Sequence, residues 1–198
     1  MYIIGVTGGI GSGKSTVSRM LEEKGAYIFD ADKIAKELIE THPDLQQELI
    51  DEFMDDIVDS SGQIVKSKLA RIGFSNQANQ EMLNEIVHPF VIQANEAKVE
   101  EIRQRGDVEL YVVDAPLLFE ADMHLRCDYT ILVYTRLKLR LERALKRGNL
   151  SREEILRRID LQMPEEEKME LADYVIENNS TREDLAQQVD RIYREIIG

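Results

Sequence analysis

The sequence predicts an α/β fold. Short runs rich in β-branched and aromatic residues recur along the chain, each is followed by a longer segment with helical spacing, and the first run leads into a glycine-rich loop. This alternation is typical of βαβ units, which build a mainly parallel sheet covered by helices. The 198 residues, 43% of them hydrophobic, suffice for one core, so we expect a single domain over residues 1–198 with a five-stranded sheet.

Five apolar segments are the candidate strands. They are Tyr2 to Val6, Tyr27 to Phe29, Leu110 to Val113, Thr130 to Tyr134 and Tyr174 to Ile176. Their apolar character suits strands that are buried on both faces of the sheet. The long segment between the second and third strands, residues 33–105, has amphipathic helical spacing, and we expect it to be a helical insertion that carries substrate contacts. Pro89 predicts a break or restart of the helix there, beside His88.

The charge balance limits the classes of partner. The chain has 25 basic and 38 acidic residues and a formal net charge of −13 at pH 7. Such a chain repels a phosphate backbone, so we expect it to bind neither nucleic acid nor a membrane. Cys127 is the only cysteine, and no signal-peptide pattern precedes the first strand. We therefore expect a cytoplasmic protein, either a monomer or a small homo-oligomer.

The strongest motif is the loop GGIGSGKST, at residues 8–16, which fits GxxxxGK[ST] between a strand and a helical segment. Its glycines let backbone N–H groups face phosphates, and the helix start adds partial positive charge. Lys14 is expected to contact the β- and γ-phosphates, Ser15 to bind Mg²⁺, and Thr16 to fix the first helical turn or reach the α-phosphate. The predicted ATP contacts in this loop are Gly11, Ser12, Gly13, Lys14, Ser15 and Thr16.

The chain lacks the marks of two other nucleotide-binding classes. A switch GTPase needs DxxG and NKxD motifs, whereas this chain has Asp114-Ala-Pro-Leu and Asn178-Asn179-Ser180-Thr181. An ATPase motor usually needs a longer chain. A small-molecule kinase fits best. A kinase for a nucleoside monophosphate or another small alcohol, and a non-catalytic nucleotide-binding regulator, stay open as alternatives.

Acidic residues follow two of the predicted strands. Asp30 and Asp32 stand where the second strand ends, and ligands of open α/β sheets gather at the carboxyl ends of strands. A hydroxyl acceptor needs a carboxylate that orients it and takes its proton, so Asp32 is the candidate catalytic base. Alternatively, Asp30 caps a helix and Asp32 is an acid favoured by the helix dipole. Asp114 ends the third run and is either a water-mediated Mg²⁺ ligand or a cap.

The segment from Arg136 to Arg158 is markedly basic in an otherwise acidic chain. At helical spacing its arginines form one stripe, with apolar residues beside it: Arg136, Arg140, Arg143 and Arg147, next to Leu137, Leu141, Ala144 and Leu145. We expect a lid over about residues 136–163, in which one face packs and the arginines meet phosphate charge, Arg143 in catalysis and Arg147 in ATP binding. Gly148 supplies a hinge, and Ser151 begins a capping box. The alternative is a solvated helix face with ordinary ion pairs.

Five segments together resemble the dephospho-CoA kinases. They are TGGIGSGKST at residues 7–16, Asp30-Ala31-Asp32, His88-Pro89, the PLLFE segment at residues 116–120, and Arg158 with Gln162. The resemblance covers the whole chain and implies a P-loop kinase fold. It also implies ATP-dependent phosphorylation of the ribose 3′-hydroxyl of dephospho-CoA, which yields coenzyme A and ADP in the last step of coenzyme A synthesis.

The resemblance also implies roles for individual residues. It places these residues on the acceptor substrate: Asp32, Lys66, His88, Pro116 and Leu117. Asn178 is expected at the adenine ring through a backbone turn. The sequence departs from the family pattern at three positions, with Lys66 in place of a frequent Arg, Arg140 in place of the usual Gln and Ser180 in place of the usual Gly. Lys66 keeps the charge of Arg but not its bidentate fork.

Overall fold

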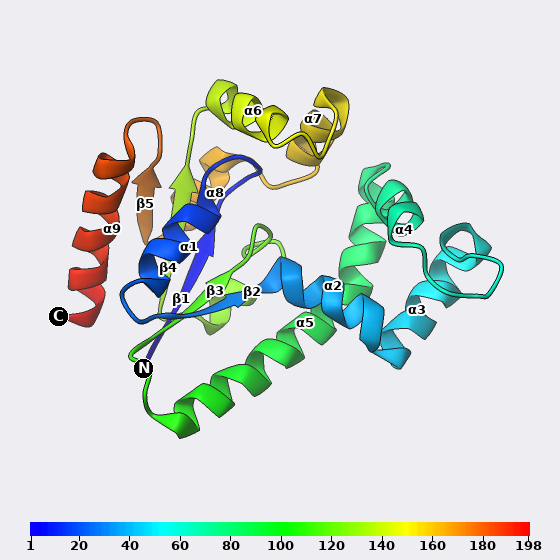
Figure 1. Ribbon diagram of the computed structural model, residues 1–198, viewed down its shortest axis with the longest axis horizontal. Helices are drawn as coiled ribbons and strands as arrows, with labels where there is room; N and C mark the ends of the chain where they lie inside the picture. Colours follow the sequence, from blue (N-terminus) through cyan, green and yellow to red (C-terminus); the bar gives the residue numbers. More distant parts are fainter. The chain divides into compact units, whose positions relative to one another are not determined.

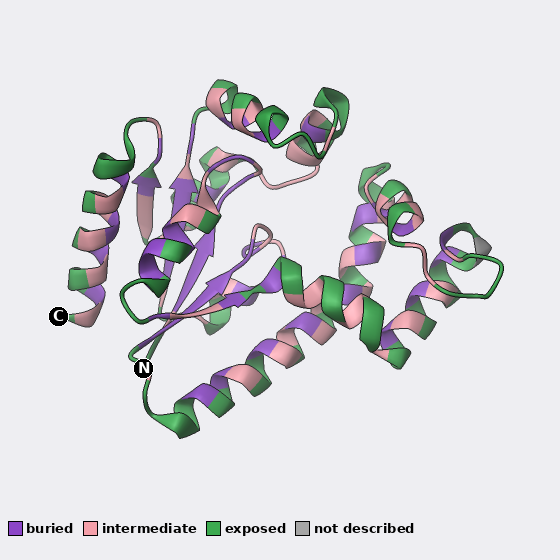
Figure 2. Cartoon of the chain, in the orientation of Figure 1, coloured by how far each residue is buried: buried purple, intermediate pink, exposed green. Residues whose placement is uncertain are grey.

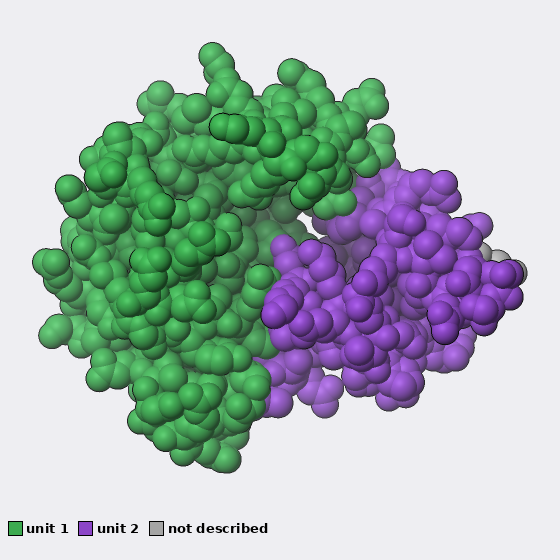
Figure 3. Space-filling view, viewed as in Figure 1, with its two compact units in different colours: residues 1–30, 98–198 green, residues 31–97 purple. Residues whose placement is uncertain are grey.

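The computed structural model describes residues 1–54 and 56–198. The chain divides into two compact units (Figure 3). The first unit comprises residues 1–30 and 98–198 and contains the whole sheet. The second unit comprises residues 31–97 and is mainly helical. The 29-residue helix α5 (Gln77–Arg105) belongs to both units.

The sheet of the first unit has the five predicted strands, each one residue longer than predicted. They are β1 (Tyr2–Thr7), β2 (Tyr27–Asp30), β3 (Leu110–Asp114), β4 (Tyr129–Tyr134) and β5 (Tyr174–Glu177). Their order is β2-β3-β1-β4-β5, and every pairing is parallel. The register places Val6 opposite Asp114, and Asp114 opposite Asp30. The central strand β1 therefore delivers the glycine-rich loop to the middle of the carboxyl edge.

Helices α1 (Lys14–Glu22) and α9 (Arg182–Ile197) pack against one face of the sheet (Figure 1). Their buried side chains form one core cluster with the strands, and the three central strands β3, β1 and β4 are buried along most of their length (Figure 2). Val17 and Leu21 of α1 and Val189 of α9 are at most 1% exposed. Burial of each such side chain contributes roughly 1.5–3 kcal/mol, so this face stabilises the site-bearing end of β1.

The opposite face of β1 is covered by the segment that follows β3. A Cβ atom on Gly5 would lie 2.5 Å from Cδ2 of Leu118 and 3.2 Å from Sγ of Cys127, so this strand position has no room for a side chain. Cys127 follows the short 3₁₀ helix η2 (Met123–Arg126). Burial raises the pKa of the Cys127 thiol to about 12, so this cysteine packs as an inert apolar group.

The remaining helices of the first unit follow β4. They are α6 (Leu137–Lys146), α7 (Arg152–Asp160) and α8 (Glu165–Leu171). The predicted capping box at the start of α7 is confirmed, since Ser151 and Glu154 bond to each other's backbone N–H groups. Within the described residues no helix has the length and apolar character that crossing a bilayer requires.

The second unit consists mainly of helices, as predicted for this part of the chain. It contains α2 (Ala31–Thr41), α3 (Pro43–Phe53), the 3₁₀ helix η1 (Met54–Ile57), α4 (Lys66–Gly73) and most of α5. The predicted break at Pro89 is wrong, because α5 continues through it. Pro89 removes a single backbone hydrogen bond. Buried Leu83, Val87 and Val91 anchor the same stretch of the helix in the unit's core and offset that loss.

Candidate active site

The glycine-rich loop joins β1 to α1 at the carboxyl edge of the sheet. Gly11 and Gly13 have φ angles of +80° and +96°, which other residues adopt only at a cost. A Cβ atom on Gly11 would lie 2.3 Å from the backbone oxygen of Arg140, and one on Gly13 would lie 2.2 Å from Nδ2 of Asn178. These two glycines are therefore required both by the turn and by what packs against it. The helix start at Lys14 directs backbone N–H groups toward the loop.

The carbonyl of Ser12 is held by residues that follow two other strands. Thr135 Oγ1 and Asn178 Nδ2 each donate to the Ser12 oxygen at 2.8 Å. Both side chains are buried, Thr135 just beyond β4 and Asn178 just beyond β5. The Asn178 side chain thus supports the phosphate loop, a role that the sequence analysis missed. Its adenine contact through the backbone turn stays a prediction.

Asp114, at the end of β3, is bonded by two side chains of α1. Lys14 Nζ forms an ion pair with Oδ1 of Asp114, and Ser18 Oγ donates to Oδ2 at 2.6 Å. The side chains of Lys14 and Asp114 are only 15% and 5% exposed. Charge-assisted bonds in such a setting are stronger than neutral ones. Asp114 is therefore a buried, paired carboxylate, which fits neither an exposed turn cap nor a helix N-cap.

The oxygen donors at this edge suit a hard divalent cation that arrives with a nucleotide. Among the described residues no group of three or more His, Cys, Asp and Glu side chains could hold a metal by itself. Mg²⁺ commonly takes one or two carboxylates and completes its shell with substrate phosphates and water. The carboxylate of Asp114 and the exposed hydroxyl of Ser15, in the first turn of α1, are donors of that kind.

The predicted basic stripe on α6 is wrong at Arg140. That side chain is buried, 3% exposed, and it packs inward with Ala144. Leu137 and Leu145, expected on the packed face, are 53% and 38% exposed. Of the predicted packed face, Ala144 is buried and Leu141 is half-buried, so the prediction is wrong for Leu137, Leu145 and Arg140. Helical spacing cannot show that a charged residue such as Arg140 has a buried partner.

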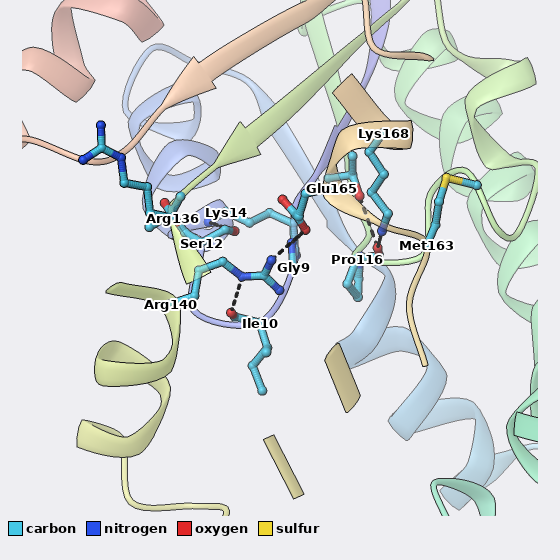
Figure 4. A network of polar contacts seen from close by, with 12 residues as sticks. Gly9, Ile10, Ser12, Lys14, Pro116, Arg136, Arg140, Met163, Glu165 and Lys168 are labelled. Carbon is cyan, nitrogen blue, oxygen red and sulfur yellow. Dashed lines mark hydrogen bonds and ion pairs between the residues drawn. The ribbon is translucent and has the colours of Figure 1, made fainter. Parts of the chain in front are cut away.

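The other arginines of the stripe remain available to solvent. Arg143 is half-buried, and its Nη1 lies 3.5 Å from Thr135 Oγ1, next to the loop support. Arg147 is exposed at the end of α6. The exposed side chain of Arg136 points away from Arg140 (Figure 4). The proposed phosphate contacts of Arg143 and Arg147 are compatible with this exposure.

A buried polar network next to the loop was missed by the sequence analysis (Figure 4). Lys168 of α8 has no exposed surface; its Nζ donates to the Pro116 oxygen at 3.0 Å and pairs with Glu120 Oε1 at 2.8 Å. The same Glu120 oxygen accepts the N–H of Met163 at 3.0 Å. These bonds fix both ends of the PLLFE segment. In the sequence, the three consecutive acids at residues 165–167 suggest a solvated helix, which hides this network. The one signal that could have indicated it is the three-residue spacing of Glu165 and Lys168, which places them on the same helix face.

Three predicted site residues belong to the second unit. Asp32 is exposed in the first turn of α2, directly after the strand end at Asp30. Lys66 begins α4 and forms an ion pair with Glu40 of α2. His88 is half-buried within α5. The remaining predicted residues belong to the first unit, where Asp114 and Asn178 bond residues 11–16 directly. The others in this unit are Pro116, Leu117, Arg143 and Arg147.

Comparison with known proteins agrees with this arrangement. A family model described as dephospho-CoA kinase matches residues 2–184. A dephospho-CoA kinase from Carboxydothermus hydrogenoformans is 43% identical over 187 residues, 94% of this chain and 90% of that protein. A crystal structure from Thermus thermophilus has a TM-score of 0.80 and 36% identity and covers 100% of this chain and 98% of that one. A dephospho-CoA kinase from Campylobacter jejuni has a TM-score of 0.67 and 27% identity, with coverages of 98% and 96%.

The match begins in β1 and ends in α9, so it includes both compact units and every predicted site residue. The phosphate loop, the parallel sheet and the acid at the end of β3 are the parts that a P-loop kinase uses to bind ATP, and such kinases generally need a divalent metal. The chain belongs to the dephospho-CoA kinase family and is a phosphoryl-transferring enzyme.

Proposed function

We propose that this enzyme transfers the γ-phosphoryl group of ATP to the ribose 3′-hydroxyl of dephospho-CoA, giving coenzyme A and ADP. The observation that carries the proposal is the complete phosphate loop, with Lys14 paired to Asp114, in a chain that belongs to this family over residues 2–184. The name of the family supplies the acceptor. The phosphate loop, in which Lys14 is paired with Asp114, supplies the ATP binding that phosphoryl transfer to any acceptor requires.

The nucleotide is bound by the loop in this proposal. Backbone N–H groups of residues 11–16 face the phosphates, and Lys14 moves from Asp114 to the β- and γ-phosphate oxygens. Ser15, and Asp114 through water, would hold Mg²⁺, which would supply positive charge against the charge that develops during transfer. Asn178 follows β5, and its backbone would meet the adenine ring.

The acceptor hydroxyl is deprotonated by Asp32. The ribose oxygen forms a bond to the γ-phosphorus while the bond from that phosphorus to the bridging oxygen of ADP breaks, and the hydroxyl proton passes to the Asp32 carboxylate. The residues that hold dephospho-CoA for this attack are Lys66, His88, Pro116 and Leu117. Arg143 meets the charge on the transferring group. Arg147 binds ATP at its phosphates, and this contact strengthens as charge develops in the transition state.

The first test is an assay of ADP release with ATP, Mg²⁺ and a panel of acceptors: dephospho-CoA, AMP, CMP, adenosine and shikimate. Turnover with dephospho-CoA alone supports the proposal. Turnover with AMP, CMP, adenosine or shikimate but without dephospho-CoA would assign the chain to another small-molecule kinase activity. Nucleotide binding without turnover of any acceptor would support a regulator instead. Omission of Mg²⁺, with EDTA present, should abolish ADP release.

The Asp32→Asn variant tests the catalytic base. The side chain keeps its size and loses the proton acceptor, so kcat should fall by about 10²–10⁴-fold while ATP affinity and the melting temperature change little. Asp44→Asn is a matched control, because Asp44 is likewise an exposed first-turn acid, on α3 of the same unit. A kcat near that of wild type with saturating dephospho-CoA would reduce Asp32 to a helix-start acid and make Asp114 the next candidate.

The cytoplasm is the compartment we propose for this activity. Its substrates are nucleotides, and the single thiol, Cys127, cannot form an intrachain disulfide. Because the net charge is −13, we expect anionic substrates to bind at a locally basic region of the protein. The same charge disfavours nucleic acid and anionic membranes as partners.

A further inference from the structure

Two consecutive residues of the phosphate loop are held by one buried ion pair. Arg140 of α6 donates from Nε to the Ile10 oxygen at 3.1 Å, and its Nη1 lies 3.1 Å from Glu165 Oε1 (Figure 4). The same Glu165 oxygen accepts the backbone N–H of Gly9 at 3.1 Å. Each member of the pair therefore bonds the loop backbone while it bonds the other member. The side chains of Arg140 and Glu165 are only 4% and 11% exposed.

The loop is also shaped to receive the guanidinium. A Cβ atom on Gly9 would lie 2.0 Å from Nη2 and 2.5 Å from Cζ of Arg140, closer than any real contact. The glycine at this position leaves the space in which the guanidinium sits against the loop. Loop and ion pair therefore fit each other both by hydrogen bonding and by shape.

Stability alone is a weak reason for this pair. A buried ion pair often stabilises a fold no better than apolar side chains of similar volume. Burial raises the pKa of the Glu165 carboxyl, although Arg140, Lys168 and the Gly9 N–H act in the opposite direction. The second carboxylate oxygen, Oε2, is buried without a hydrogen-bond partner among the described residues. The Glu165 carboxylate is thus buried at a cost in desolvation free energy, in a position where it accepts the Gly9 N–H of the loop.

A direct role for Arg140 in phosphate binding fits the contacts poorly. Its Nε and Nη1 groups are already bonded to Ile10 and Glu165. Nε and Nη1 could bind a phosphate only after these bonds had opened, and the Arg140 side chain is only 4% exposed. Arg143 and Arg147, farther along the same helix, are more accessible.

We propose that Arg140 and Glu165 act as a positioning pair for the phosphate loop. They hold the backbone of Gly9 and Ile10 before the nucleotide arrives, so that the loop does not have to be ordered when ATP binds. The pair connects α6 and α8 to the loop, which makes nucleotide affinity depend on both helices. This proposal deepens the proposed function at its ATP site and does not depend on which acceptor is phosphorylated.

The test compares Arg140→Gln and Glu165→Gln with the double variant Arg140→Leu/Glu165→Leu. Each single variant leaves one buried group without its partner, so both the melting temperature and the ATP affinity should fall. The double variant removes both charges, so its melting temperature should recover towards that of wild type. Its Kd for ATP, measured by calorimetry without acceptor, should stay about 10- to 100-fold weaker, because Gly9 and Ile10 remain unsupported.

Surface variants supply the control. Arg105 and Asp107 form an exposed pair at 2.7 Å, and Arg105→Leu/Asp107→Leu should change neither the melting temperature nor the ATP Kd appreciably. If ATP affinity recovers together with the melting temperature in the Arg140/Glu165 double variant, or if neither single variant changes the Kd, the pair is purely structural and the proposal is wrong. Binding is measured without acceptor, so an error in the acceptor assignment would not affect this outcome.

A conservative variant provides a second line of evidence if the double variant does not fold. Arg140→Lys keeps the charge and can pair with Glu165, but its single ammonium lacks the planar fork that reaches Glu165 and Ile10 together. The ATP Kd should weaken about tenfold or more, with a smaller loss of melting temperature than in Arg140→Gln. Wild-type affinity in Arg140→Lys would overturn the proposal.

Discussion

Lys14 has two roles at the level of single residues. It is the proposed loop cation for phosphate, and in the structure it neutralises the buried carboxylate of Asp114. The second role follows from burial, because an unpaired carboxylate at 5% exposure would be costly. The contact also holds the ammonium at the loop in the nucleotide-free protein, since β3 and α1 both belong to the same packed unit.

Lys14→Met should lower kcat by about 10²–10³-fold, because it removes a charge that stabilises the transferring phosphoryl group. It should also lower the free energy of unfolding by about 1–3 kcal/mol, since the ammonium partner of Asp114 is lost. ADP release and urea unfolding measure the two effects. Lys24→Met, at a surface ion pair with Asp190, is the control and should affect neither strongly. Turnover within a few-fold of wild type would contradict the role of Lys14.

Asp184 makes the stability of the protein depend on pH. Its hydrogen bonds from Ser180 and Thr181 lower the pKa of its carboxyl below the ordinary value of 3.8. A carboxyl with a lowered pKa in the folded state stabilises the protein above pH 3.8, and this contribution is lost as the pH falls through the folded-state pKa.

Asp184→Asn should therefore be less stable than wild type at pH 5–7, and the difference should shrink below about pH 3.8. Urea unfolding across this range measures it. Glu183→Gln, in the same first turn but outside the capping box, separates the helix-dipole effect from the hydrogen bonds. A difference that stays constant down to pH 2.5 would show that the Asp184 bonds do not persist in solution.

Among the elements, α6 combines two kinds of arginine. Arg140 faces inward and holds the loop, whereas Arg143 and Arg147 are reachable from solvent. The first turn of α6 is therefore anchored to the loop, while the last turn of the same helix leaves positive charge accessible to a ligand. Gly148, with a φ of +73°, follows as the predicted hinge before α7.

Arg143→Ala and Arg147→Ala should lower kcat by about 10²-fold or more and change the KM for ATP by no more than a few-fold, if these residues meet charge that develops in the transition state. Steady-state kinetics with dephospho-CoA would measure both quantities. Lys138→Ala is the matched control, because Lys138 is exposed on the same helix and has no proposed contact. Variants that change only the ATP KM would make the arginines ground-state binders.

The elements show which features a sequence can predict. The five strands were predicted because buried parallel strands carry uninterrupted apolar runs. The loop was predicted because its glycines and lysine have fixed spacing. The Arg140–Glu165 pair was missed because its members are far apart in sequence and no periodicity links α6 to α8. The break at Pro89 was predicted wrongly because a local rule carries no information about the tertiary packing that keeps α5 continuous.

At the scale of the whole molecule, charge is distributed unevenly. The net charge is −13, whereas the segment from Arg136 to Arg158 is basic. Mutual repulsion of the acids opposes compaction, and dissolved salt screens it. The nucleotide-free protein should therefore melt several degrees higher at about 200 mM NaCl than at about 10 mM NaCl, at pH 7.

The same melting series at pH 5 provides the control, since the sequence pI is about 4.8 and net repulsion nearly vanishes there. The salt effect should disappear at this pH. A melting temperature that falls with salt at pH 7 would mean that specific surface pairs such as Lys24 with Asp190 outweigh the net charge.

The supports of the phosphate loop lie late in the chain. The loop is complete by residue 16, but Thr135, Arg140, Glu165 and Asn178 are the residues that hold it. Synthesis runs from the N-terminus at about 5–20 residues per second, so a nascent chain carries the motif long before its supports leave the ribosome. A ligand stabilises only the state that binds it. ATP can therefore assist the maturation of this protein with its full affinity only after β5 and Asn178 have been made.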